Sequence, residues 1–182
     1  MQPVLSAEHW EIMRCSCRIE REVAVMDLLY SSGGRVSEIC QLNISDMDFI
    51  NRRARIYGKC RKEREIYFSA QASLHIRDYL KTRTDDNPAL LVGTKSPCRR
   101  LTIAGIQWIL KSIQSRDERL NGLKISPHTF RRSCGTDMLN RGAPVEMVKE
   151  KLGHAKADTT LQCYAKISTE AVRDAERRFG AA

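Results

Sequence analysis

The chain has 182 residues, 42% of them hydrophobic and 29% charged, which predicts one globular domain with a real hydrophobic core. The formal net charge of +9 favours a polyanionic partner such as nucleic acid. No apolar run approaches the roughly 20 residues that cross a bilayer, and the first residues lack the charged and apolar regions of a secretion signal, so we expect a cytoplasmic protein with no membrane partner.

The first part of the chain predicts helices. Ser6 is a candidate N-cap for a helix to about residue 14, and a second helix follows over about 19–30, with Val23 on its apolar face. Two consecutive glycines end the second helix, and a short helix restarts at Arg35. An arginine that directly follows two glycines, where backbone N–H groups are free, is well placed to hold a phosphate.

Residues 47–68 predict three short strands, over 47–50, 54–57 and 65–68, joined by polar turns. The second turn carries Lys59 at the tip of a hairpin, from which a lysine side chain can extend toward a ligand. Turn lysines are common, so this position alone would indicate no more than a solvated side chain.

The middle of the chain returns to helix. A helix is predicted from Ala70 to just before residue 84, with Leu74 among its apolar residues, and 90–92 is a candidate short strand. Thr102 caps a helix to about residue 115. Its inward residues are expected to be Ile106, Ile109, Leu110 and Ile113.

The stretch from Ser126 to Arg132 places a titratable imidazole and a fixed cation on one helix. Pro127 suits the first helical turn, and His128 and Arg131 are neighbours on the helix surface because they lie three residues apart. The nearby N-terminus adds partial positive charge, so that surface favours an anion. An apolar stripe on another face, Phe130, Cys134 and Met138, would anchor this helix to the core.

Beyond this helix, Pro144 opens another helix, which Gly153 closes, and a last helix is predicted over 168–179. The seven cysteines are odd in number and include no C-x-x-C pair, which disfavours a zinc site. We expect reduced, mostly buried thiols, no metal ion and no other cofactor.

Positive charge gathers in two segments. Residues 51–64 carry seven lysines and arginines against one glutamate, and residues 97–132 carry eight against two acids, so that each segment has a net charge of +6. The rest of the chain is slightly acidic. This distribution is more typical of a binding surface than of a solubility device.

Six polar residues at special positions complete the pattern: Arg35, Lys59, His128, Arg131, His154 and Tyr164. They stand in five motifs, SGGRVSE (32–38), GKCRKER (58–64), SPHTFR (126–131), LGH (152–154) and TTLQCY (159–164). With these motifs the chain resembles the tyrosine recombinase (phage integrase) family. Five blocks in the family's order are far more specific than a lone H-x-x-R.

The resemblance implies an integrase-type catalytic domain, mainly α with a small three-stranded antiparallel sheet (α+β), that recombines double-stranded DNA without cofactor. Tyr164 would attack the phosphodiester and form a 3′-phosphotyrosyl bond. His128 would take its proton, Lys59 would protonate the leaving 5′-oxygen, and His154 would hydrogen-bond the phosphate. The two catalytic arginines would neutralise the phosphate oxygens, for which a planar guanidinium suits better than an ammonium.

Further residues follow from the same resemblance. Glu38 and Asp46 match acidic positions expected to support the site. Within the two basic segments, the candidate DNA contacts are Arg61, Lys62, Arg64, Arg99, Arg100 and Arg132. Gly34 stands where the family usually has a large apolar residue, Cys60 replaces a common glycine, and Tyr164 follows His154 by ten positions where many members have nine.

The resemblance also bears on organisation. Residues 1–182 are expected to form a single catalytic domain, with the family's N-terminal core-binding domain absent. A homo-oligomer on DNA, a tetramer joined through helix 168–179, and a monomer without DNA are expected. The alternative that this helix packs on its own domain stays open, since its small apolar face stabilises little by burial.

Three other functions compete. A type IB topoisomerase uses similar chemistry but needs no synapsis of two DNA sites. A non-catalytic DNA-binding remnant of the fold should have lost some of the six catalytic groups, and none is lost. A metal-dependent nuclease is disfavoured because no carboxylate cluster suits a two-metal site.

Overall fold

The computed structural model describes residues 4–57 and 63–153 of the chain. It is mostly helical with one three-stranded antiparallel sheet, which confirms the predicted fold class. Lys59, His154, Tyr164 and the predicted helix over 168–179 lie outside the described residues. The elements in chain order are α1 (Ala7–Cys15), α2 (Glu20–Ser32), α3 (Val36–Gln41), the 3-10 turn η1 (Ile44–Asp46), β1 (Met47–Asp48), β2 (Arg53–Tyr57), β3 (Glu63–Tyr67), α4 (Ala70–Thr82), α5 (Ile103–Gln114), the 3-10 turn η3 (Glu118–Leu120), α6 (Pro127–Asn140) and α7 (Val145–Leu152).

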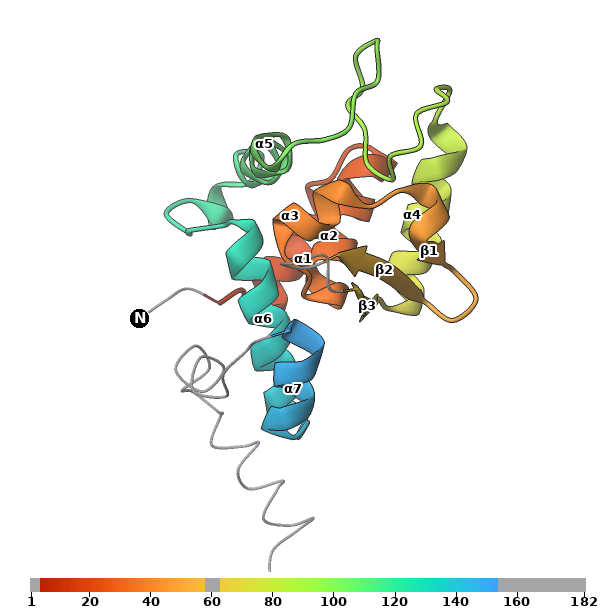
Figure 1. Cartoon of the computed structure of the whole chain (residues 1–182). Helices are drawn as coiled ribbons and strands as arrows, with labels where there is room; N and C mark the ends of the chain where they lie inside the picture. The colour runs from red at the N-terminus through yellow and green to blue at the C-terminus, as the bar shows by residue number, and fades with distance from the viewer. Residues whose placement is uncertain (1–3, 58–62, 154–182) are drawn as a thin grey trace, which may run out of the picture.

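Helix α2 is the centre of the fold, because α4, α5 and α6 all pack against it (Figure 1). With neighbours on several sides it buries more than one stripe, and Ala24, Val25 and Met26 are all fully buried. Val23, predicted on the inner face, is only half-buried. No helix in the described part of the chain has both the length and the apolarity to cross a membrane.

Side-chain caps start four of the helices, as the sequence predicted for two of them. Ser6 accepts a hydrogen bond from the backbone N–H of residue 9, and Thr102 accepts one from residue 105, each at 3.1 Å. Ser69 and Ser126 cap α4 and α6 in the same way. Such a cap contributes about 1 kcal/mol, so the caps fix where each helix begins. The predicted inward residues of α5 are all buried.

The sheet has the order β1-β2-β3, and its three strands confirm the predicted hairpins. Residues alternate between its faces, so Ala54, Ile56 and Ile66 face the core. The predicted strand over 90–92 is wrong. Its buried residues form only isolated bridges, because the backbone of Leu90 bonds Leu42 while Val92 pairs with residue 100, and no continuous ladder develops.

Helix α4 corrects one further prediction. Ala72, Ile76 and Tyr79 recur at steps of four and three residues and are buried together against α2. Leu74 lies two residues from both Ala72 and Ile76, which turns it to the opposite face, and it is 62% exposed.

The cysteines are less buried than predicted. Of the five that the structure describes, Cys40 and Cys134 are buried, Cys17 and Cys98 are half-buried, and Cys15 is exposed. All five are free thiols. Burial raises the pKa of Cys17 to about 12, so that sulfur stays protonated at neutral pH. Among the described residues, no three His, Cys, Asp or Glu side chains gather as a metal site.

Helix α7 packs against α6, where Val148 and Leu152 meet Leu139 (Figure 1). Gly153 ends α7 in the left-handed conformation, with φ of 63°. Gly33 ends α2 in the same way, with φ of 59°. A Cβ on Gly33 would lie only 2.6 Å from the Leu152 side chain, so the ends of α2 and α7 touch because residue 33 is a glycine.

Candidate active site

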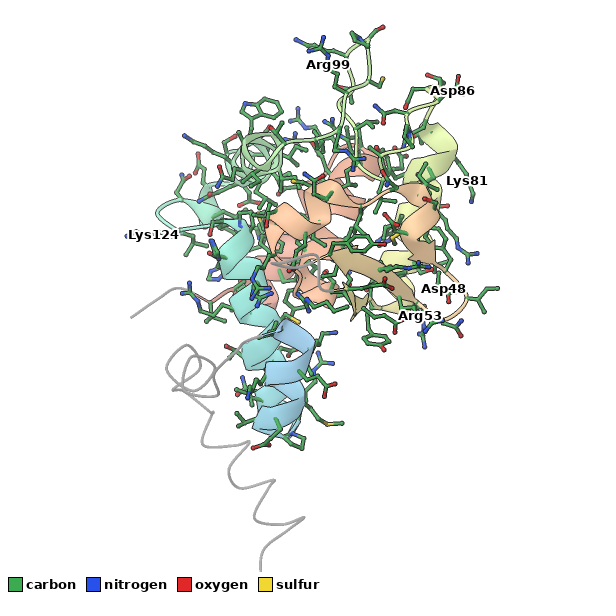
Figure 2. All side chains as sticks on the ribbon, in the orientation of Figure 1. Asp48, Arg53, Lys81, Asp86, Arg99 and Lys124 are labelled. Atoms are coloured by element: carbon green, nitrogen blue, oxygen red, sulfur yellow. The ribbon has the colours of Figure 1, made fainter. Side chains whose placement is uncertain are left out.

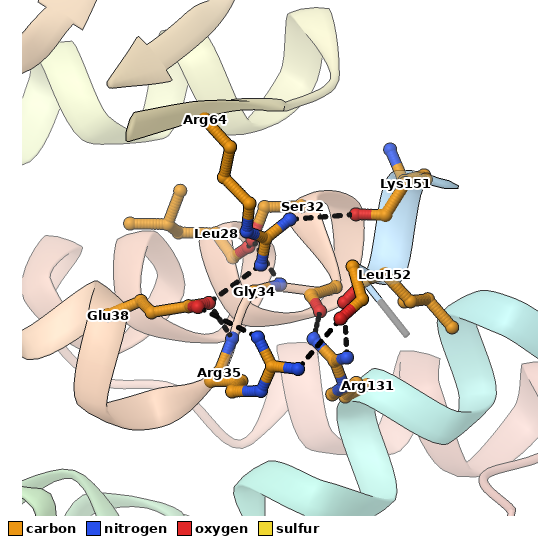
Figure 3. A network of polar contacts seen from close by, with 11 residues as sticks. Leu28, Ser32, Gly34, Arg35, Glu38, Arg64, Arg131, Lys151 and Leu152 are labelled. Carbon is orange, nitrogen blue, oxygen red and sulfur yellow. Dashed lines mark hydrogen bonds and ion pairs between the residues drawn. The ribbon is translucent and has the colours of Figure 1, made fainter. Parts of the chain in front are cut away.

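The candidate site lies where the C-terminal end of α7 meets the start of α3, the second turn of α6 and strand β3 (Figure 3). Three consecutive carbonyls at the end of α7, those of residues 151–153, each accept a hydrogen bond from a different arginine. The donors are Arg64 to Lys151, Arg131 to Leu152 and Arg35 to Gly153. The last carbonyls of a helix have no partner within it and carry partial negative charge, so this end attracts cations.

Arg35 is the N-cap residue of α3, as the two preceding glycines predicted. Its backbone N–H donates to Glu38 Oε2 at 2.9 Å, and its Nη1 donates to Glu38 Oε1 at 2.9 Å. Nη2 donates to the carbonyl of Gly153 at 2.8 Å. Glu38 thus fixes the guanidinium from one side and the end of α7 fixes it from the other. The side chain is still 44% exposed, so a ligand can reach it.

Glu38 is a buried carboxylate held by two arginines. Besides Arg35, Arg64 donates from Nη2 to Glu38 Oε2 at 2.8 Å. Burial raises the pKa of the Glu38 carboxyl, but the Arg35 N–H and the Arg64 charge outweigh burial, so its pKa lies below the ordinary value. Glu38 is therefore ionised at neutral pH, between the guanidinium groups of Arg35 and Arg64.

Arg131 lies on α6 and is only 8% exposed. Its Nη1 donates to the carbonyl of Gly33 at 2.5 Å, and its Nη2 donates to that of Leu152. Since Leu152 and Gly153 are consecutive, the guanidinium groups of Arg131 and Arg35 are anchored side by side, although the two residues lie far apart in the chain.

His128 stands in the first turn of α6, three residues before Arg131, and is exposed. The two residues differ in exposure, because Arg131 is buried against α2 and α7 while His128 faces solvent. Of the six predicted catalytic residues, the structure thus describes Arg35, His128 and Arg131.

The predicted DNA contacts fall into different settings. Arg99 is exposed at the tip of the loop before α5 (Figure 2). Arg100 is half-buried, and its guanidinium donates to the carbonyls of Cys40 at 3.0 Å and Leu42 at 2.8 Å. Arg132 is half-buried on α6. Arg64 belongs to the cluster at the end of α7, and Arg61 and Lys62 lie outside the described residues.

Asp46, the second predicted supporting acid, lies in η1. Its Oδ2 accepts a hydrogen bond from the backbone N–H of Asn43 at 2.8 Å, which closes the turn between α3 and β1. Asp46 thus shapes the path of the chain out of α3, the helix that Arg35 caps.

Part of the basic charge counted in the sequence is used inside the fold. Arg116 forms two hydrogen bonds, at 2.6 and 2.7 Å, with the buried carboxylate of Glu22. Arg53 pairs with Asp48 at 3.0 Å and with Glu65 at 2.8 Å, and Figure 2 shows Arg53 beside Asp48 at the sheet. Net charge per segment therefore overstates the charge that a ligand meets.

The sequence motifs did not predict that Arg64 binds Glu38 and the end of α7. The alternation of side chains along a strand could have predicted this contact, because Arg64 and the apolar Ile66 are two residues apart and point to the same face of β3. Ile66 is fully buried, so Arg64 had to point inward as well.

Comparison with known proteins places these residues in a family context. The model of the phage integrase family matches residues 6–171. The chain is 37% identical over 156 residues to the tyrosine recombinase XerC of Herpetosiphon aurantiacus, covering 82% of this chain and 49% of that protein. It is 36% identical over 156 residues to XerA of Pyrococcus horikoshii, covering 85% of this chain and 53% of that protein. The chain thus spans about half the length of these curated relatives.

Solved structures share the fold. A crystal structure of XerA recombinase matches with a TM-score of 0.83 and 23% identity, covering 100% of this chain and 67% of that one. The Tn1549 transposon integrase in complex with transposon right end DNA matches with a TM-score of 0.80 and 18% identity, again covering 100% and 67%.

Proposed function

The chain belongs to the phage integrase family, and from this premise we propose that it carries out site-specific DNA recombination through a covalent 3′-phosphotyrosyl intermediate. The curated relatives described above are tyrosine recombinases, which favours recombination over topoisomerase-like relaxation.

The observation that carries the proposal is the pairing of two guanidinium groups at the end of α7. Arg35 and Arg131 donate to adjacent carbonyls directly before His154. Two fixed cations side by side suit a phosphodiester, whose negative charge repels nucleophiles and grows in the transition state. Because both arginines are held before the ligand arrives, little reorganisation accompanies binding.

The proposed reaction starts with attack by Tyr164. Its hydroxyl oxygen bonds to the scissile phosphorus while the bond from phosphorus to the 5′-oxygen breaks. An ordinary tyrosine has a pKa near 10, so the phenol proton must leave during attack, and His128 is the candidate base. His128 is exposed at the start of α6, so it can exchange that proton with solvent.

The 5′-oxygen leaves with a proton from Lys59, while His154 donates a hydrogen bond to the phosphate. The covalent bond keeps the phosphoester energy, so a free 5′-hydroxyl from another strand can reverse the step without a cofactor. Exchange of the attacking strand turns cleavage into recombination.

We further propose double-stranded DNA as the partner, and a homo-oligomer on DNA, a tetramer, joined through the segment 168–179. Deleting the residues after Ser168 should leave DNA binding almost intact while changing cleavage and abolishing ordered assembly. Normal full-site complexes from the truncated protein would show that this segment serves its own domain only.

The test of the function uses short duplexes tiled across the DNA that flanks the gene, each nicked so that the released fragment diffuses away. Wild-type protein should form an adduct that resists SDS, and Tyr164→Phe should bind DNA but form none. Tyr67→Phe is a matched control, because Tyr67 is an exposed tyrosine on the described sheet. Loss of the adduct in the control and its persistence in Tyr164→Phe would contradict the assignment.

A circular plasmid with two copies of the reactive site then separates recombination from relaxation. Recombination gives products in which the DNA between the sites is inverted or excised. Loss of supercoils without any exchanged product would show topoisomerase-like activity instead.

A further inference from the structure

We propose that Arg64 is a positioning residue, which orients Arg35 through Glu38 and holds the end of α7 in place, rather than a contact to DNA. This inference rests on the proposed function for its catalytic consequence. Its structural basis is the cluster of contacts around one guanidinium (Figure 3).

The Arg64 side chain points into the protein. Arg64 lies on β3 two residues before Ile66, so both point to the inner face of the sheet. Its side chain is only 22% exposed, against 57% for Arg55 on the neighbouring strand β2. A side chain that the protein covers to this extent presents less surface to a duplex than an exposed arginine does.

The guanidinium of Arg64 donates hydrogen bonds to two different elements. Nη2 donates to Glu38 Oε2 at 2.8 Å, and Nη1 donates to the carbonyl of Lys151 at 3.3 Å. The planar fork thus joins the buried acid of α3 to the C-terminal end of α7. A lysine offers one ammonium on a flexible stem and does not reproduce this fixed fork.

Arg64 also packs closely against Gly153. A Cβ on that glycine would lie 2.9 Å from Arg64 Cζ, so the guanidinium fills the space that a side chain at residue 153 would take. Arg64 therefore contacts the last described residue before His154.

Removing Arg64 would change the surroundings of Glu38. This carboxylate receives Arg35 on one side and Arg64 on the other, so the two arginines share one buried negative charge. Without Arg64, Glu38 has lost a charged partner and the Lys151 carbonyl has lost its donor. The position of Arg35 and the exit of the chain from α7 are then less constrained.

The experiment compares Arg64→Met, Arg64→Lys and the matched control Arg55→Met, which removes one positive charge from the adjacent strand where Arg55 pairs only loosely with Glu63, at 3.5 Å. Adduct formation on the reactive nicked duplex is measured in single turnover, at a temperature where circular dichroism shows every variant folded. Affinity for the same duplex is measured in parallel.

We expect Arg64→Met to bind DNA as Arg55→Met does, while its adduct-forming rate at saturating DNA falls on the order of 10- to 100-fold, similar to the loss when a residue that orients a metal ligand is removed. Arg64→Lys should fall as well, because charge alone does not replace the fork. Arg55→Met should keep the wild-type rate.

A second readout does not depend on the reaction. Hydrogen exchange of the amides of residues 149–153 in DNA-free protein should be faster in Arg64→Met than in Arg55→Met. If wild type forms no adduct, the proposed function fails. The exchange result still tests whether Arg64 holds the end of α7 in place.

The positioning role is overturned by either of two results. One is weaker DNA binding in Arg64→Met than in the control with an unchanged saturating rate, which would make Arg64 a DNA contact. The other is an Arg64→Met protein with wild-type exchange at residues 149–153.

Discussion

Replacing Gly33 with alanine tests the contact between the ends of α2 and α7 most sharply. Gly33 has φ of 59°, a conformation in which a side chain costs about 1–2 kcal/mol. In addition, the new Cβ would lie 2.6 Å from Leu152 Cδ2 and 3.2 Å from Cys134 Sγ, both on buried residues. Overpacking of this kind adds about 1–3 kcal/mol.

Gly142 provides the matched control. It has φ of 84°, and a Cβ there would meet nothing within 4 Å, so Gly142→Ala carries the backbone cost without the clash. Alanine also restricts the unfolded chain more than glycine does, and this offsets about 0.4–1 kcal/mol of the cost in both variants. We therefore expect Gly33→Ala to lose about 2–4 kcal/mol of unfolding free energy and Gly142→Ala about 1 kcal/mol.

The assay is urea unfolding at neutral pH, followed by tryptophan fluorescence. Trp10 is a suitable reporter because it stacks on Tyr30, with ring centroids 4.3 Å apart, and meets Phe130 of α6 edge-on. Equal losses in the two glycine variants would refute the close approach of α2 and α7. The difference between the variants, rather than either value alone, is the test.

The remaining predictions concern charges. Arg116→Met should lose about 3 kcal/mol of unfolding free energy because it leaves the buried Glu22 carboxylate without the guanidinium that pairs with it. The exposed Arg119→Met should change stability by less than about 1 kcal/mol, and similar losses in urea would contradict the distinction. Folding lowers the pKa of Glu38, so the stabilisation that its carboxylate contributes is complete above the ordinary pKa of 4.5 and is lost as the pH falls through the lowered pKa. Glu38→Gln should therefore lose less stability in acid than wild type does. Urea unfolding midpoints over an acid pH series measure this difference. DNA affinity should fall linearly with salt on a log-log plot, by about −0.9 per phosphate contacted, and a flat slope would rule out a phosphate-dominated interface.

Local signals explain which elements were predictable. Ser6 and Thr102 are caps because a short side-chain oxygen reaches the free N–H groups of a first turn, and this needs no knowledge of the rest of the fold. The glycine at 153 likewise ended α7 as expected. Strand periodicity located the sheet, since its buried residues alternate along β2.

Contacts between residues far apart in the sequence determined the features that were not predicted. The strand predicted over 90–92 failed because its backbone found only single partners, at Leu42 and at residue 100. Arg100 and Arg116 belong to a basic segment that is typical of a DNA-binding surface. In the structure, however, Arg100 donates to backbone carbonyls and Arg116 donates to the buried carboxylate of Glu22. A count of charges cannot reveal which arginines the fold itself uses.

In the candidate site, sequence motifs named Arg35 and Glu38, but the motifs gave no geometry. The structure adds that Arg35 and Arg131 meet at adjacent carbonyls, and that Arg64 reaches the same helix end. These contacts depend on the return of α7 against α6 and α2, which no local pattern encodes.

The most direct test of the central claim is to map the covalent bond between protein and DNA. The SDS-resistant complex is digested with nuclease and trypsin, and mass spectrometry locates the residual nucleotide, while the released DNA end is labelled with polynucleotide kinase. We predict the nucleotide on Tyr164, joined through a 3′-phosphate, and a free 5′-hydroxyl that accepts label. A nucleotide on Tyr57, Tyr67 or Tyr79, or a blocked 5′ end, would contradict the account.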